Sequence, residues 1–135
     1  LPVPGGNLPF DVLYDEPTRL YWLASNRIVD SMSRPDRLPD ARRGLPAHER
    51  HGIELHVSRN LVDWSFAGLV ADGAPGNHVL HSPALAIRGP DLCILCQAGD
   101  EACRNPMESN LITARVIPGF RELIAPPAPT APRQA

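Results

Sequence analysis

The chain has 135 residues, of which 43% are hydrophobic and 21% charged, and this composition is typical of one globular domain. The formal net charge is -2, and the 13 basic residues, all arginine, form no continuous block. A nucleic-acid-binding surface of clustered cations is therefore excluded. No segment approaches the roughly 18 consecutive apolar residues that a membrane-spanning helix needs, so we expect no membrane span and no nucleic-acid partner.

The first half of the chain predicts four short strands joined in sequence, at residues 10–14, 20–24, 53–57 and 64–70. Residues 53–57 alternate apolar and polar side chains, as a half-buried strand does. Short polar turns at 15–19 and 59–63 join the first pair and the last pair of strands. A stretch rich in proline and arginine at 26–51 predicts a long connection between the two pairs.

The second half of the chain repeats this order of strands and turns. Strands are expected at 83–88, 92–97, 111–117 and 122–124, with tight turns at 89–91 and 118–121. In each half, a short turn followed by a large aromatic residue joins the third strand to the fourth. We expect these two aromatics, Trp64 and Phe120, to wedge between neighbouring units of this kind. The proline- and alanine-rich tail at 125–135 is expected to be disordered.

Two four-stranded antiparallel units in succession predict an all-β fold built from β-propeller blades. One blade cannot bury both of its faces alone, and two blades cannot close a ring. The sequence begins LPVPGG, without methionine or a signal peptide. We therefore interpret residues 1–124 as the C-terminal blades of a five- or six-bladed β-propeller whose upstream blades are missing from this chain.

The lengths of the connections predict where a site should lie. Successive connections of an antiparallel meander alternate between the two ends of the sheet. The long connections at 26–51, 71–82 and 98–110 should therefore gather at one end, which we call the loop-rich end. Binding and catalytic residues usually lie on long loops held by a rigid scaffold.

The cysteines and histidines do not predict a metal centre. Cys93 and Cys96 have C-x-x-C spacing, but in a strand they point to opposite faces and cannot share a metal ion. Cys103 is expected to be a lone thiol in a loop, where it can be either exposed or buried. His78 and His81 share a loop without further ligands nearby. We expect no metal and no cofactor.

Several segments together resemble bacterial exo-α-sialidase-like β-propeller proteins of the glycoside hydrolase type. They include FDVLYD at 10–15, LYWLAS at 20–25, DSMSRP at 30–35, LPAHERH at 45–51, LHVSRNLVDW at 55–64 and GFREL at 119–123. The resemblance covers roughly residues 5–124. Members of the family tend to carry other residues where this chain has Ser82, Gln97 and Met107, and each of these positions lies in or beside the loop-rich end.

The resemblance implies a glycoside hydrolase that acts on terminal sugars of glycans, with arginines holding an acidic sugar. One alternative is a non-catalytic glycan-binding propeller, and another is a structural or protein-interaction propeller. The differences from the family at Ser82, Gln97 and Met107 favour glycan binding without catalysis. The resemblance implies a bacterial source, but it does not indicate a cellular compartment. The residues alone do not identify a catalytic acid or a nucleophile.

Six residues of the loop-rich end are candidate substrate-binding residues. Asp30 and Arg34 belong to the DSMSRP segment, and their alternative role is an ion pair or turn that organises a long loop. Glu49 and Arg50 directly precede a strand, where a surface salt bridge is the alternative. The other two candidates are His81 and Asp100, and Asp100 would otherwise belong to a solvated acidic turn.

Overall fold

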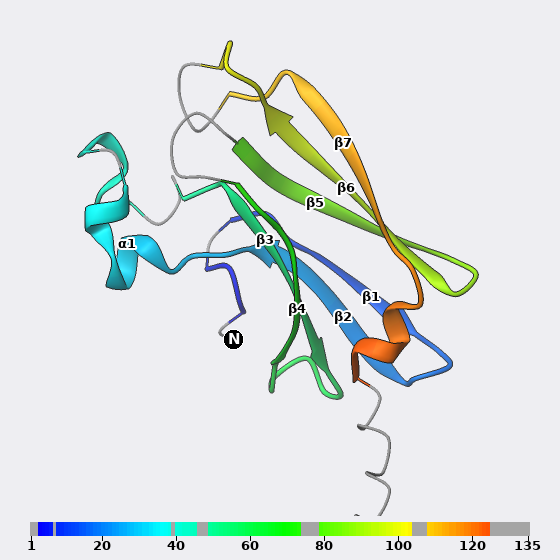
Figure 1. The fold of residues 1–135 in the computed structure, drawn as a ribbon. Coiled ribbons are helices and arrows are strands. Elements are labelled where there is room, and N and C mark those ends of the chain that lie inside the picture. Colours follow the sequence, from blue (N-terminus) through cyan, green and yellow to red (C-terminus); the bar gives the residue numbers. More distant parts are fainter. Residues whose placement is uncertain are drawn as a thin grey trace, which may run out of the picture.

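The computed structural model describes residues 3–6, 8–38, 40–45, 49–73, 79–103 and 108–124, without the side chains of residues 32 and 42. Two antiparallel sheets lie face to face as two layers (Figure 1). The first sheet has the order β1-β2-β3-β4, and the second has the order β5-β6-β7. Strands β1 to β4 span Asp11–Asp15, Leu20–Asn26, Gly52–Ser58 and Ser65–Asp72; β5 to β7 span Val79–Arg88, Asp91–Gly99 and Leu111–Ile117.

Strand β6 shows how the sequence pattern builds this arrangement. Its buried residues Leu92, Ile94 and Cys96 alternate with more exposed neighbours, because successive side chains of a strand point to opposite faces. Cys93 is only half-buried and lies on the other face from the buried Cys96, and both thiols are free. The prediction that these two cysteines point to opposite faces of one strand is confirmed.

The core lies between the two sheets. Side chains from β2, β3 and β6 form it, and Trp22 and Phe120 are both fully buried within it. The two rings meet edge to face, with centroids 4.8 Å apart and planes inclined by 72°. The predicted place of Phe120 between the two units is confirmed. Trp64 is only half-buried and lies outside this core, so its predicted place between blades stays a prediction.

The second sheet has three described strands, because the strand expected at 122–124 does not form. Residues Phe120–Ile124 instead make a short 3-10 helix, η4. Gly119 turns the chain with a φ of +57°, a conformation that side chains oppose, and the Glu122 amide then donates a hydrogen bond to the Gly119 carbonyl (2.9 Å). The all-β prediction is confirmed, whereas the second unit is not four-stranded among the described residues.

An ion pair between distant parts of the chain holds η4 in place. Arg121 donates to both carboxylate oxygens of the buried Asp15, at 2.9 and 2.6 Å, across 106 positions of sequence. The Asp15 pKa is lowered mainly by the hydrogen bond from Arg121, which outweighs the opposing effect of burial. Thr18 adds a further hydrogen bond at 2.7 Å. The turn between β1 and β2 is thereby tied to η4.

Strand β5 begins four residues before its predicted start at residue 83. The pairing of β5 with β6 is interrupted between His81 and Ala84, and Ser82 has a φ of +50°. Pro83, which lies in this irregularity, has no backbone N–H to donate, and a bulge is one of the few places where a strand tolerates proline. The irregularity redirects the chain at His81, beside the loop-rich end.

Candidate functional site at the loop-rich end

The strand pairing places the three long connections at one end of the two sheets. Strands β2, β4 and β6 finish there and β3, β5 and β7 begin there, as the antiparallel registers require (Figure 1). The Asn26 amide nitrogen joins the two sheets at this end, with hydrogen bonds to the carbonyls of Leu80 (2.7 Å) and Gly52 (3.1 Å). The predicted loop-rich end is therefore present.

Glu49 organises the connection between β2 and β3. Its Oε1 accepts hydrogen bonds from the amides of Val29 (2.8 Å) and Asp30 (2.7 Å), and its Oε2 accepts one from Ser31 (2.9 Å). These amides begin α1 (Asp30–Ser33), so one carboxylate satisfies three donors that have no partner within the helix. Burial raises the Glu49 pKa, but the hydrogen bonds from Ser31, Val29 and Asp30 outweigh it and hold the pKa below its usual value.

Asp30 lies beside Glu49 and is also buried. Its Oδ1 accepts a hydrogen bond from Arg37 at 3.1 Å, and its Oδ2 lies 3.8 Å from Nε2 of His51. His51 is 4% exposed. The sequence analysis selected Asp30 and Glu49 as separate candidates. The structure places them in one cluster with His51.

Arg50 and His81 are two further buried residues at the loop-rich end. The Leu80 amide donates a hydrogen bond to the Arg50 carbonyl, which brings the start of β5 against the segment before β3. The His81 pKa is lowered mainly by burial and further by the positive charge of Arg50. Burial also lowers the Arg50 pKa. The His81 Nδ1 lies 2.9 Å from the Ser82 hydroxyl.

The other two candidates, Arg34 and Asp100, do not join this cluster. Arg34 is exposed and makes a two-point contact with Asp36, at 3.0 and 2.8 Å, so the alternative of an ion pair within the loop is present. Asp100 accepts hydrogen bonds from the Asn110 side-chain amide and the Ala102 backbone amide, both at 2.9 Å. These contacts close the base of the connection between β6 and β7.

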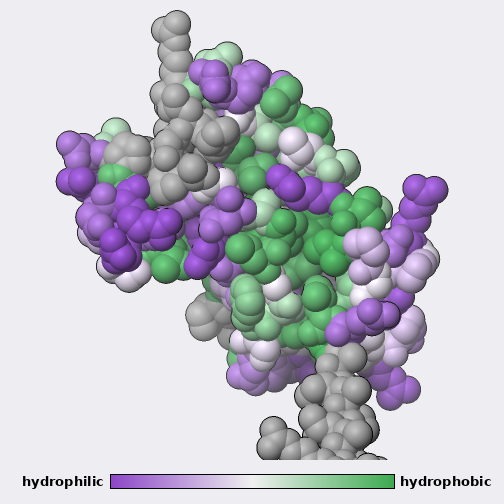
Figure 2. All heavy atoms as spheres, in the orientation of Figure 1, coloured by the Kyte–Doolittle hydropathy of each residue, from purple (hydrophilic) through white to green (hydrophobic). Residues whose placement is uncertain are grey.

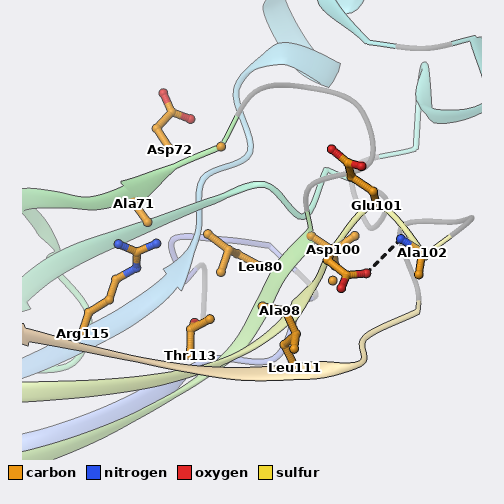
Figure 3. A pocket seen from close by; sticks show the side chains of 13 residues that line it. Ala71, Asp72, Leu80, Ala98, Asp100, Glu101, Ala102, Leu111, Thr113 and Arg115 are labelled. Atoms are coloured by element: carbon orange, nitrogen blue, oxygen red, sulfur yellow. Dashed lines mark hydrogen bonds between the residues drawn. The ribbon is translucent and has the colours of Figure 1, made fainter.

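A cleft of about 770 Å³ opens between the two sheets at the same end. Strands β4, β5, β6 and β7 contribute lining residues, among them Asp72, Leu80, Thr113 and Arg115 (Figure 3). Asp100 and Glu101 line the cleft from the connection after β6. In Figure 3, Arg115 lies at one end of the view, and Asp100 and Glu101 lie at the other. The cleft thus combines an apolar floor with acids and one arginine.

Arg115 is a cleft residue that the sequence analysis did not select. It belongs to β7, and in the strand register it shares a face with Thr113, which also lines the cleft. It makes no ion pair with a described residue. Strand alternation, which puts residues two apart on one face, was the signal that could have found it.

Cys103 is buried at 4% exposure, so the thiol is not exposed, although the sequence left that open. The chain folds back after β6, and the Cys103 amide donates a hydrogen bond to the Asp100 carbonyl at 3.0 Å. The thiol then packs over Gly99, where an added Cβ would lie 2.8 Å from the Cys103 sulfur. Gly99 therefore makes room for this buried cysteine.

Three features of the sequence analysis, His78, Met107 and the tail at 125–135, lie outside the described residues. Gln97 and Ser82 are described. Gln97 is exposed and accepts a hydrogen bond from Ser109 (3.3 Å), and Ser82 contacts His81.

Comparisons with protein families, curated proteins and solved structures find no match to this chain. No helix in the described part is long and apolar enough to cross a membrane. The structure itself shows an all-β protein with two antiparallel sheets and a cluster of buried ionisable residues at their loop-rich end.

Proposed function

We propose that the loop-rich end binds a terminal sugar of a glycan, within a sialidase-like glycoside hydrolase. The observation that carries the proposal is the gathering of buried ionisable groups at the end where the cleft opens. None of these groups lines the cleft, but the carbonyls of Arg50 and His51 accept hydrogen bonds from the lining residues Leu80 and Gly73. Asp30, Glu49, Arg50, His51 and His81 are all at most 9% exposed. Charged groups are seldom buried without a structural or functional reason, and perturbed groups beside a cleft mark candidate sites.

The cleft suits an acidic sugar better than a neutral one. Arg115 offers a planar set of donors that can bind a carboxylate through two parallel hydrogen bonds. Asp100 and Glu101 can accept hydrogen bonds from sugar hydroxyls. Apolar residues such as Leu80 and Leu111 provide a surface for the carbon skeleton of a sugar ring. The resemblance to sialidase-like proteins supports the same class of ligand.

The test is a titration of the chain with sialosides and other terminal glycosides, followed by an assay for released sugar. We expect saturable binding, and we expect Arg115→Ala to weaken it about tenfold or more, because a charge-assisted hydrogen bond is lost. Arg88→Ala is the matched control, because Arg88 is exposed at the opposite end of the second sheet.

Three results separate the alternatives. Release of free sugar supports hydrolysis, whereas binding without release supports the non-catalytic glycan-binding protein that Ser82, Gln97 and Met107 favour. If no glycan binds or shifts the melting temperature, the glycan proposal is wrong, and a structural or protein-interaction role takes its place.

We also propose that the two sheets are blades of a β-propeller. The outward face of the second sheet supports this, because it is apolar and exposed. Leu95 pairs with Ala84 and Ala114 across the sheet, and Ile112 and Val116 share this face with them. Ile112 is 77% exposed. Figure 2 shows that hydrophobic residues are also exposed over the middle of the molecule, around β4, whereas hydrophilic residues gather around α1. A further antiparallel blade would bury such a face.

The reading frame upstream of the Leu1 codon tests the propeller proposal. We expect it to continue through further four-stranded repeats of the same length and pattern. A stop codon directly upstream, together with a monomeric chain that melts in one sharp transition, would contradict the proposal, because two blades cannot cover their outer faces alone.

A further inference from the structure

Three side chains that can bind a metal ion meet beside α1. One oxygen each of Asp30 and Glu49 and one ring nitrogen of His51 all lie within 4.8 Å of one another. The three residues are 5%, 1% and 4% exposed. Two carboxylates and an imidazole form a donor set that suits Mn²⁺ and Zn²⁺. We propose that Asp30, Glu49 and His51 bind one divalent transition-metal ion.

The distance between Asp30 and His51 fits this proposal. Oδ2 of Asp30 and Nε2 of His51 are 3.8 Å apart, which is too long for a hydrogen bond. Two ligand atoms that each lie about 2.1 Å from one metal ion are separated by roughly 3 to 4 Å. Arg37 binds the other oxygen of Asp30, at 3.1 Å, and so directs Oδ2 toward His51.

Glu49 is already held in the orientation that a ligand needs. Its Oε1 accepts two backbone hydrogen bonds, whereas its Oε2 accepts one from Ser31 and keeps a lone pair for a metal ion. Such outer contacts commonly fix the position of metal-binding carboxylates. Capping of α1 accounts for the position of Glu49, but it does not account for Asp30 and His51 meeting beside it.

The local charge also favours a cation. Asp30 and Glu49 place two carboxylates together in a buried site, and the half-exposed Arg37 offsets one of these negative charges. A divalent ion would compensate the remainder inside a region of low dielectric. It would also join α1 to the segment before β3. The proposal does not depend on glycan binding.

The test is a titration of the EDTA-treated full chain with Mn²⁺ alone, because Mn²⁺ prefers oxygen and nitrogen ligands to the three cysteine thiols. Binding to the folded state should raise the melting temperature by about 5–10 °C at saturation. Co²⁺ should give the visible absorption of a protein-bound ion. The site would be refuted if Mn²⁺ left the melting temperature unchanged and Co²⁺ gave no visible absorption of a protein-bound ion.

Matched variants show whether these residues hold the ion. His51→Gln and Asp30→Asn should each weaken Mn²⁺ binding at least tenfold, whereas His56→Gln and Asp36→Asn should leave it unchanged. His56 is a half-buried histidine of β3 that lies 3.6 Å from Glu54, and Asp36 is an exposed acid after α1. In any variant that keeps its fold, the Co²⁺ spectrum also shows whether the substituted residue binds the ion. A spectrum and affinity unchanged by His51→Gln would overturn the assignment.

Discussion

Replacing Phe120 with alanine is expected to lower the free energy of unfolding by about 3–5 kcal/mol. Phe120 is fully buried, packs edge to face on Trp22, and places its ring in the core between the two sheets. Its removal leaves a cavity where the two layers meet and also releases Arg121, which lies over the Phe120 ring at 4.7 Å. Urea unfolding followed by circular dichroism measures the loss.

The matched control for this substitution is Phe66→Ala. Phe66 is 62% exposed on β4, so the same chemical change should alter the free energy of unfolding by no more than about 0.5 kcal/mol. If the two alanine variants lost the same stability, Phe120 would not be a core residue, and the packing of η4 between the sheets would be wrong.

Replacing Glu49 with alanine is expected to cost about 2–4 kcal/mol of stability, because three backbone amides lose their acceptor at once. The amides of Val29, Asp30 and Ser31 should then exchange their hydrogens faster. Glu49→Gln should cost less, since an amide oxygen can still accept hydrogen bonds, but its NH₂ group cannot accept one from Ser31.

Glu16→Ala is the control for Glu49, because Glu16 is exposed in the turn between β1 and β2. It should leave both the stability and the exchange rates unchanged. A Glu49→Ala variant as stable as the wild type, with the amides of residues 29–31 still protected, would show that α1 does not depend on this carboxylate.

Much of the fold could be predicted because strands are encoded locally. The alternation in β3, the apolar run of β6 and the short turns at 15–19 and 89–91 predicted the order of the strands and the end at which the long connections lie. Asp30 could be chosen because it belongs to the DSMSRP segment, and Glu49 because it directly precedes a strand. That they meet in space could not be predicted, since 18 to 20 positions separate Glu49 from the amides it accepts.

Contact between distant segments explains why the strand predicted at 122–124 does not form and why Arg115 was missed. The pattern at 122–124 suits a strand, but burial of Phe120 against Trp22 and the pairing of Arg121 with Asp15 favour η4. Cys103 is buried because the chain turns back over Gly99. Arg115 enters the cleft only because the second sheet lies against the first. No short window of sequence contains both Phe120 and Trp22, or both Arg121 and Asp15, whereas Gly99 and Cys103 lie only four positions apart.

Hydrogen exchange of the full chain, with and without sialyllactose, tests the proposed glycan site most directly. We expect saturable protection in the described parts of the three long connections and at the start of β7, around Thr113 and Arg115. The turns at 15–19 and 89–91, at the opposite end, should not change. Protection confined to those turns, or no protection with any sialoside, would contradict a glycan site at the loop-rich end.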